Sequence, residues 1–251
     1  EIRYAGYDCI ILEGISPKPV YLFIDDDRVE LRDASHMWGM GCVTLEKQLK
    51  DKLGEEFQIA VIGPGGENLV PFASINHDFG RQAGRGGVGT VMGVKKLKAL
   101  VVRGTKSVPV ADVEAYRQAG KAIFKACKDA EGLEPWQTYG TTIVASWCDE
   151  VGALPTRNFS AGSFEDAKGI YGTTMREKIV ITDKGCFGCP SPCGKYSHVK
   201  RYDTRVEGPE YETIGMIGSN LGIGDIEEVA QANLLCDELG IMVWQEFPLT
   251  W

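Results

Sequence analysis

Three cysteines lie within eight residues of the sequence, in the stretch "GCFGCPSPCGKY". Cys186, Cys189 and Cys193 have the spacing Cys-x2-Cys-x3-Cys, and thiolates are soft ligands that suit zinc or iron–sulfur clusters. Zinc sites usually pair two short Cys or His motifs, whereas one compact loop can supply three corners of a cubane cluster. The spacing therefore favours an iron–sulfur cluster. Zinc with His198 as fourth ligand, and a purely structural group of thiols, are the alternatives.

A glycine-rich stretch, "GRGGVGTVMG", contains Gly84, Gly86 and Gly89 in the pattern G-x-G-x-x-G. A dinucleotide-binding loop of that kind needs a strand directly before it and a helix of ordinary length after it. We predict neither, because "HDFGRQA" precedes the glycines and Gly93 interrupts the segment after them. The stretch predicts instead a flexible loop whose backbone amides, with the Arg85 guanidinium, suit a phosphate or another anion. A tight turn that needs glycine for packing is the alternative.

Two groups of carboxylates are further candidates for functional residues. The stretch "EGPEYETIG" holds Glu207, Glu210 and Glu212 within six residues. Such a cluster can include a general acid or base, although a solvated surface is the commoner outcome. Asp237, in "CDELG", has a carboxylate that could accept two parallel N–H donors, such as the amino-pyrimidine edge of a pterin. A surface aspartate at a helix end is the ordinary alternative.

Composition limits the classes of function. The 251 residues include 27 Lys and Arg against 35 Asp and Glu, a formal charge of −8, which argues against a nucleic-acid-binding surface. No apolar run is long enough to span a membrane. The eight cysteines are too few for a disulfide framework, and no signal peptide is recognisable, so we expect a cytoplasmic location. The opening "EIRYAGYDCIILEG" is typical of the interior of a sheet, and we expect residues upstream of it.

The first hundred residues predict strands separated by turns. We expect strands in "YDCIILEG" and "LKALVVRG", and two more around the Gly/Pro turn of "QIAVIGPGGENLVPFASI". "PVYLFIDDDRVELRD" predicts a hairpin about the acidic turn at residues 25–27. Leu45, Leu49 and Leu53 recur every four residues, which predicts one helix ended by Gly54.

The pattern becomes helical after residues 104–109. Apolar positions recur with helical spacing from Val113 onward, towards Gly132. A second helix is expected from Asp225, whose spacing to Glu228 resembles a capping box, to a stop at Gly240. The expected fold class is α+β: a β-rich N-terminal domain over residues 1–106, then a mainly α-helical domain with long loops over residues 107–251.

Taken in order, these motifs resemble the aldehyde ferredoxin oxidoreductase family, tungsten enzymes with a bis-pyranopterin cofactor and a [4Fe–4S] cluster. The stretches that carry the resemblance are "GRQAGRGGVGTVMGVKKLKALVVRG", "GALPTRNF", "CFGCPSPCG", "EGPEYETIGMIGSNLGI" and "ANLLCDELG". The resemblance covers essentially the whole chain. It implies that residues 1–106 are a pterin-binding domain incomplete at its start, and residues 107–251 a cluster-binding domain incomplete at its end.

The resemblance also implies roles for single residues. The implied pterin contacts are Arg85, Gly86, Gly87, Asp237 and Gly240, and the implied cluster ligands are Cys186, Cys189 and Cys193. Glu212 matches a glutamate that transfers protons beside the metal. Ile241 stands where the family's Asp-x-x-Gly-Leu motif has leucine. The family's fourth cluster cysteine is expected outside this chain.

The implied activity is oxidation of an aldehyde to a carboxylic acid, with two electrons taken up by tungsten, or by molybdenum as the alternative metal. The cluster would pass these electrons singly to ferredoxin or to an iron–sulfur subunit, within a homo- or hetero-oligomer. An acidic protein that meets acidic ferredoxin needs a local basic patch, for which "KKLK" and "GKYSHVKR" are candidates.

Two other functions stay open. The first is the catalytic subunit of a tungsten-dependent aromatic acyl-CoA reductase of the benzoyl-CoA type, which would act on an acyl-CoA thioester instead of an aldehyde. The second is a non-enzymatic metal-binding or electron-transfer module, in which zinc and no pterin would be found.

Overall fold

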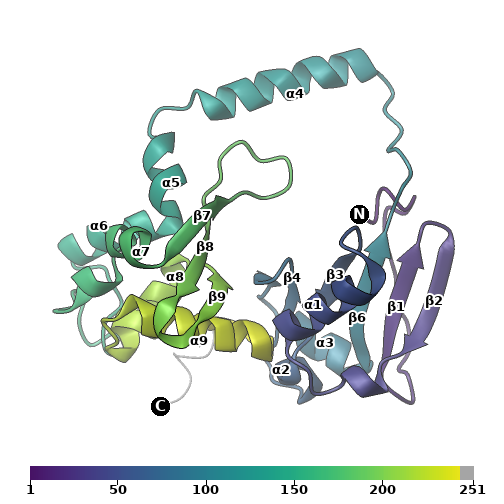
Figure 1. Ribbon diagram of the computed structural model, residues 1–251, viewed down its shortest axis with the longest axis horizontal. Coiled ribbons are helices and arrows are strands. Elements are labelled where there is room, and N and C mark those ends of the chain that lie inside the picture. The colour runs from purple at the N-terminus through teal and green to yellow at the C-terminus, as the bar shows by residue number, and fades with distance from the viewer. Residues whose placement is uncertain (244–251) are drawn as a thin grey trace. The chain divides into compact units, whose positions relative to one another are not determined.

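The computed structural model describes residues 1–243, and these fall into two compact units (Figure 1). The first unit comprises Glu1–Pro109 and Leu235–Met242, and the second includes Val110–Leu234. The predicted α+β class is confirmed. Residues 244–251 of the expected second domain lie outside the described part of the chain, and the binding roles given to the two domains stay predictions.

The first unit is built on a mixed sheet with the strand order β2-β1-β6-β3-β4-β5. Its strands are β1 (Val20–Asp25), β2 (Arg28–Asp33), β3 (Gln58–Val61), β4 (Ile75–His77), β5 (Arg81–Ala83) and β6 (Leu97–Arg103). Strands β1 and β6 pair in parallel, and every other neighbouring pair in this sheet is antiparallel. The helices of this unit are α1 (Cys42–Leu53), α2 (Pro64–Glu67) and α3 (Val88–Val94).

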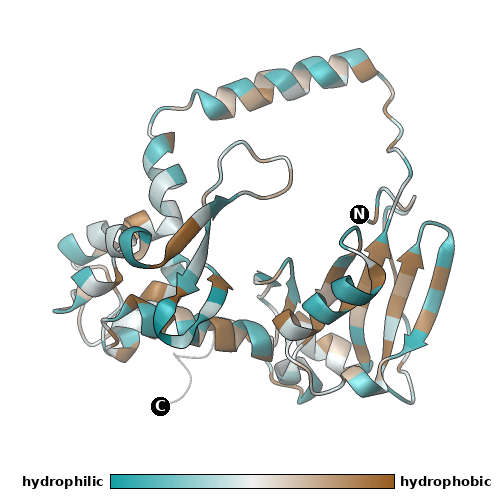
Figure 2. Cartoon of the chain, in the orientation of Figure 1, coloured by the Kyte–Doolittle hydropathy of each residue, from teal (hydrophilic) through white to brown (hydrophobic). Residues whose placement is uncertain are grey.

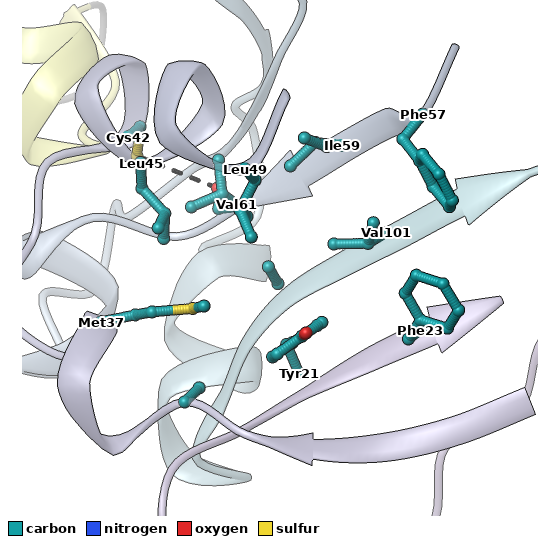
Figure 3. Packing of buried hydrophobic residues seen from close by; sticks show 12 residues of the cluster. Tyr21, Phe23, Met37, Cys42, Leu45, Leu49, Phe57, Ile59, Val61 and Val101 are labelled. Atoms are coloured by element: carbon teal, nitrogen blue, oxygen red, sulfur yellow. Dashed lines mark hydrogen bonds between the residues drawn. The ribbon is translucent and has the colours of Figure 1, made fainter. Parts of the chain in front are cut away.

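Hydrophobic side chains cover both faces of this sheet. Successive strand residues point to opposite faces, so Tyr21 and Phe23 join one buried cluster while Leu22 and Ile24 join another. Figure 3 shows the first cluster, in which Leu45 and Leu49 of α1 lie over the sheet. The second cluster includes Met92 of α3 and Leu97 of β6. Burial of both faces explains why β1 and β6 are mostly apolar on both sides of the strand.

Several predictions for the first unit are confirmed. The hairpin forms between β1 and β2, with Asp26 in its turn at φ 50°. Helix α1 ends at Leu53, and Gly54 follows it at φ 120°. The strand predicted in "YDCIILEG" is wrong: residues 7–14 form no strand, and Ile11 is 79% exposed. After β3 the chain forms the short helix α2, and the second strand begins only at Ile75.

The second unit is mainly helical, as predicted. Its helices are α4 (Val113–Lys128), α5 (Leu133–Tyr139), α6 (Val144–Glu150), α7 (Gly172–Lys178), α8 (Tyr211–Thr213) and α9 (Ile226–Leu239), the last turn of which belongs to the first unit. It also contains an antiparallel sheet that the sequence did not predict, with the order β7-β8-β9. These strands are β7 (Val180–Lys184), β8 (Gly194–Val199) and β9 (Thr204–Glu207). They escaped prediction because β7 and β8 are mostly polar and carry no clear alternation.

The predicted bounds are correct for α9, and α4 begins at Val113 as predicted, but Gly132 does not mark its end. Asp225 accepts a hydrogen bond from Glu227 N at 2.9 Å, and Gly240 follows the helix at φ +67°. Helix α4 ends at Lys128, and Gly132 instead precedes α5 at φ 75°. No helix described between residues 1 and 243 combines the length and apolarity needed to cross a membrane.

Candidate functional site

The three clustered cysteines lie in the loop between β7 and β8. Antiparallel pairing brings Lys184 opposite Gly194, so residues 185–193 close a hairpin loop. The C-terminal end of this loop is tightly held: a Cβ on Gly140 would meet the Cys193 carbonyl oxygen at 2.3 Å. The buried Lys195 Nζ donates to the Gln137 carbonyl at 2.6 Å and to the Pro192 carbonyl at 3.3 Å. The hairpin therefore presents the cysteines on a loop that is anchored at its base.

The thiols themselves are accessible. Cys186 and Cys189 are exposed and Cys193 is half-buried. Ser191 N lies 3.4 Å from Cys189 Sγ and donates a hydrogen bond to it. Within residues 1–243, no three His, Cys, Asp or Glu side chains are gathered closely enough to hold a metal ion. The chemistry of the donors fits a soft metal or cluster, and the role of the three cysteines as ligands stays a prediction.

The glutamate segment lies next to the base of this loop. Lys184, two residues before Cys186, forms an ion pair with the buried Glu207 at the end of β9. Glu210 accepts a hydrogen bond from Thr141 Oγ1, and Tyr211 N donates to that same oxygen at 2.9 Å. Two of the three clustered glutamates therefore hold the chain in place.

Glu212 differs from these two glutamates because its side chain is exposed. It lies in α8, between the Thr141 contacts and a hydrogen bond from Thr213 Oγ1 to Asn233 Oδ1 at 2.9 Å. The chain then continues as a π-helical turn over residues 214–218, a rare element that occurs often at functional sites. The structure thus leaves Glu212 as the glutamate of this cluster that is available to a ligand.

Tyr211, next to Glu212 in the sequence, has a phenol whose pKa is clearly shifted. Burial, and then the hydrogen bond to Cys148 Sγ at 3.2 Å, raise the pKa of Tyr211 above its ordinary value. Tyr211 therefore stays neutral and adds no charge next to Glu212 at physiological pH.

In the first unit, the glycine loop connects β5 to α3. Gly86 and Gly87 have φ +84° and +66°, which side chains other than glycine rarely adopt. A Cβ on Gly87 would meet the Pro71 carbonyl oxygen at 2.2 Å, and one on Gly89 would meet the Ser74 carbonyl oxygen at 2.3 Å. Packing thus explains Gly87 and Gly89. A Cβ on Gly86 would have no atom within 4 Å, so this position, next to the exposed Arg85, leaves the backbone open to a ligand.

The rejection of a dinucleotide-binding loop agrees with the structure. A short strand, β5, does precede the glycines, contrary to our expectation, but it pairs antiparallel with β4 at the edge of the sheet. The helix after the glycines has only 7 residues. The parallel strand–helix–strand unit of a dinucleotide-binding loop is therefore not formed here.

Asp237 and Gly240 lie in the tight turn that ends α9. The Asp237 side chain is buried, and its Oδ1 accepts a hydrogen bond from Gln82 Nε2 at 2.6 Å. The Asp237 carbonyl accepts from Asn76 Nδ2 at 2.9 Å, and Ser74 N donates to the Gly240 carbonyl at 2.8 Å. The turn is thus fixed to β4, to β5 and to the segment before them.

The two groups of predicted pterin contacts flank one segment of the chain, residues 71–76. The glycine loop packs on it through Gly87 and Gly89, and the α9 turn pairs with it through the bridge between Ala73 and Ile241. A Cβ on Gly84 would meet Met242 Sδ at 2.9 Å. The structure therefore brings together two motifs that lie about 150 positions apart in the sequence, as one ligand-binding site requires. Contact with a pterin stays a prediction.

Sequence reasoning missed the residues that hold these groups. Those that the structure adds are Asn76, Gln82, Thr141, Lys184 and Asn233. Gln82 and Asn233 lie inside motifs quoted above, but all five residues meet their partners through the tertiary fold. No local signal in the sequence could have identified these partners.

Known proteins match along the same two parts of the chain. Residues 1–104 match the family model "aldehyde ferredoxin oxidoreductase, N-terminal domain", and residues 118–243 match "aldehyde ferredoxin oxidoreductase, domains 2 & 3". Tungsten-containing aldehyde ferredoxin oxidoreductases from Thermococcus kodakarensis and Pyrococcus furiosus are 44% and 42% identical to this chain over 243 residues. These matches cover 96% of this chain and 40% of each relative, so the chain spans less than half the length of those proteins.

A solved structure matches as well. It is the active site complex BamBC of benzoyl-coenzyme A reductase with 1,5-dienoyl-CoA. It superimposes with a TM-score of 0.78 at 29% identity, over 97% of this chain and 39% of the other. Together with both domain models, these matches show that the chain belongs to the aldehyde ferredoxin oxidoreductase family.

Proposed function

We propose that this chain is part of a tungsten-dependent oxidoreductase that converts an aldehyde to a carboxylic acid and passes the electrons to ferredoxin. The observation that carries the proposal is the arrangement in the second unit. There, a hairpin loop presents three accessible thiols, and the Lys184–Glu207 ion pair ties its base to the segment that exposes Glu212. The names of the relatives, tungsten-containing aldehyde ferredoxin oxidoreductases, supply the metal and the substrate class.

The overall reaction fixes what the protein must handle. One aldehyde and one water give one carboxylic acid, two protons and two electrons. A tungstopterin, held by the predicted pterin contacts, would supply two-electron chemistry, and an iron–sulfur cluster, held by the three cysteines, would supply one-electron transfer. Two ferredoxins are therefore reduced for each aldehyde oxidised. The protein's own residues have to bind these groups and move the protons.

In this proposal Glu212 moves a proton. Its exposed carboxylate accepts a proton from the water as the new carbon–oxygen bond forms, and releases it afterwards to solvent. Glu207 and Glu210 are already engaged with Lys184 and Thr141, so they position the chain and do not serve as the base.

The cofactors would be held by separate groups. Cys186, Cys189 and Cys193 supply thiolate ligands to the cluster, and the N–H of Ser191 lowers the charge density on one sulfur. In the first unit, Arg85 suits a cofactor phosphate, and the open side of Gly86 permits close approach of the backbone. Asp237 and Gly240 form the second part of this binding site, held in place by Gln82 and Ser74.

The proposal is tested by replacing the base while keeping its shape. Glu212→Gln, purified anaerobically with its cofactors, should oxidise aldehydes with benzyl viologen as acceptor about 100-fold more slowly than the unchanged protein, with equal tungsten and iron content. Glu131→Gln, an exposed glutamate beyond α4, is the matched control and should keep the full rate. A Glu212→Gln protein with full metal content and an unchanged rate would contradict the assignment.

Reduction of an aromatic acyl-CoA thioester is the second candidate, favoured by the structural match to the benzoyl-coenzyme A reductase complex. The two candidates differ in the substrate and in the direction of electron flow. Incubation with benzoyl-CoA and a strong one-electron reductant should give no dienoyl-CoA product if the chain is part of an aldehyde-oxidising enzyme that reduces ferredoxin. Formation of that product, without turnover of any aldehyde, would replace our proposal with this one.

A further inference from the structure

Helix α4 presents an apolar stripe that the rest of its unit leaves uncovered. The described structure buries none of its residues. Tyr116, Ile123 and Phe124 recur at intervals that place them on one side of the helix, and they are 67%, 64% and 51% exposed. Figure 2 shows hydrophobic segments alternating with hydrophilic ones along α4. Contiguous exposed apolar side chains of this kind mark interaction surfaces.

This stripe adjoins the cysteine loop. A groove of about 380 Å³ is lined on one side by α4, with Tyr116 and Phe124, and on the other by Gly188 and Pro190 of the loop. Phe187, between the first two cysteines, is 95% exposed. A partner that covers the groove would therefore lie directly against the loop that carries the predicted cluster ligands.

A basic stripe runs beside the apolar one. Arg117, Lys121, Lys125 and Lys128 recur at intervals of four, four and three residues, and so lie on one side of the helix. Glu114 is the only carboxylate within α4, which gives the helix a formal charge of +3 in a chain whose total is −8. Within residues 1–243, Lys121 and Lys128 form no ion pair. Arg117 pairs with Glu114 at 3.5 Å and Lys125 pairs with Asp129, so the charge that the described structure leaves without an ion pair beside the apolar stripe lies at Lys121 and Lys128.

The basic segments singled out from the sequence are engaged elsewhere. In "KKLK", Lys98 is fully buried and pairs with Glu67, while Lys96 Nζ donates to the Pro17 carbonyl at 2.9 Å. In "GKYSHVKR", Lys195 is buried against carbonyl groups, and Arg201 pairs with Asp225 and Glu228 at 2.6 and 3.1 Å. Lys98 and Lys195 are therefore not available as surface charges, whereas Lys200 is exposed, and a role of the two segments in carrier binding stays a prediction.

We propose that α4 and the cysteine loop together form the docking surface for an acidic iron–sulfur electron carrier. This α4 docking surface consists of Tyr116, Ile123, Phe124 and Phe187 as its apolar part, and Arg117, Lys121, Lys125 and Lys128 as its basic border. It rests on the proposed function, which requires a carrier that accepts one electron at each encounter. An apolar centre with a charged border is the usual form of such an interface.

The two parts of the surface act on different steps of the encounter. The basic border attracts an acidic carrier over a distance of about 10 Å at moderate salt and so raises the association rate. The apolar groove then fixes the carrier against the loop, so that its cluster accepts one electron and leaves. Because each aldehyde yields two electrons, two successive docking events are needed for each turnover, and weak, fast binding is favoured.

The test compares charge reversals on two helices in the protein purified with its cofactors. Lys121→Glu with Lys128→Glu changes α4, and Lys47→Glu with Lys52→Glu makes the same change of charge on exposed lysines of α1. Association with an acidic [4Fe–4S] ferredoxin is measured by biolayer interferometry at about 50 mM and about 300 mM sodium chloride. Aldehyde oxidation is measured with that ferredoxin and with benzyl viologen, and the oligomeric state by light scattering.

The α4 reversal should lower the association rate at low salt about tenfold and raise the KM for ferredoxin, with the viologen rate unchanged. The α1 reversal should leave ferredoxin association as it is. An equal effect of both reversals, or no effect of the α4 reversal, would refute the docking surface.

A change of oligomeric state without a change in ferredoxin binding would refute it too, and would assign the face to a second copy of the chain. Absence of aldehyde turnover with viologen in the unchanged protein refutes the proposed function instead, while the interferometry still decides where the carrier binds.

Discussion

The carboxylate of Asp237 accepts a hydrogen bond from Gln82 Nε2 at 2.6 Å, across 155 positions of the sequence. Asp237 is 4% exposed, so its carboxylate is oriented by neighbouring residues, and Gln82 is one of them. Strand β5 therefore supplies both a residue that orients Asp237 and, directly after it, the glycine loop. The two predicted halves of the pterin site are linked through Gln82.

Gln82→Met tests that link. Methionine has a similar length and no N–H donor, so the buried carboxylate loses a hydrogen bond, and the free energy of unfolding should fall by about 1.5–3 kcal/mol. Urea denaturation measures the change. Gln48→Met, at an exposed position of α1, should change it little. Equal effects of the two substitutions would show that the contact does not support the fold.

Gly240→Ala tests the tight packing of the α9 turn. A Cβ at this position would meet Gly63 N at 2.7 Å and Cys42 Sγ at 3.0 Å, on a backbone with φ +67°. Gly14→Ala is the matched control, because Gly14 has φ +79° and no atom within 4 Å of a Cβ. Gly240→Ala should be more destabilising by about 1–3 kcal/mol, the cost of overpacking alone. Thermal or urea unfolding that gave the same loss for both variants would contradict the packing described here.

Lys98→Met tests the buried ion pair of the first unit. The side chains of Lys98 and Glu67 are 0% and 3% exposed, and Lys98 Nζ also donates to the Met40 and Ile62 carbonyls at 2.8 and 2.7 Å. Removal of the cation leaves a buried carboxylate without its partner charge, which should lower the free energy of unfolding by about 3–5 kcal/mol. Adding Glu67→Gln should restore part of this loss in a denaturant titration. No recovery in the double variant would show that charge is not the cause.

Thiol reactivity tests the burial of Cys42. Burial raises the pKa of the Cys42 thiol well above its ordinary value, so the folded protein keeps that thiol protonated and shielded from reagents. At about pH 8, iodoacetamide should label the exposed Cys9 and Cys127 and leave Cys42 unmodified, as read by peptide mass spectrometry. The difference should persist as the pH rises through the ordinary thiol range and should disappear in urea. Equal labelling of Cys42 and Cys9 in the folded protein would be inconsistent with this structure.

Local signals predicted the elements that depend on local chemistry. The leucine spacing of α1 and the glycines after α1 and α9 placed those helices correctly, because capping and periodicity are properties of neighbouring residues. The acidic turn of the β1–β2 hairpin was predicted for the same reason. The apolar run at residues 7–14 was misleading, since a short run of this kind shows burial only when a neighbouring strand covers it.

Partnerships between distant residues could not be predicted. Lys98 was taken for part of a surface patch, and only the fold reveals that it is buried against Glu67, 31 positions away. The same holds for the distinction among the three clustered glutamates, which depends on Lys184 and Thr141. The polar strands β7 and β8 were missed because their pairing, and not their composition, makes them a sheet.

Metal analysis of the natively purified protein tests the central claim most directly. Tungsten, molybdenum, iron and zinc are measured together, per chain, after anaerobic purification. Tungsten with about four irons is the result that a pterin site and a cubane cluster predict, and Cys189→Ser should lose the iron, whereas Cys9→Ser should keep it. Zinc alone, without tungsten, molybdenum or iron, would contradict the account and leave a metal-binding module in place of an oxidoreductase.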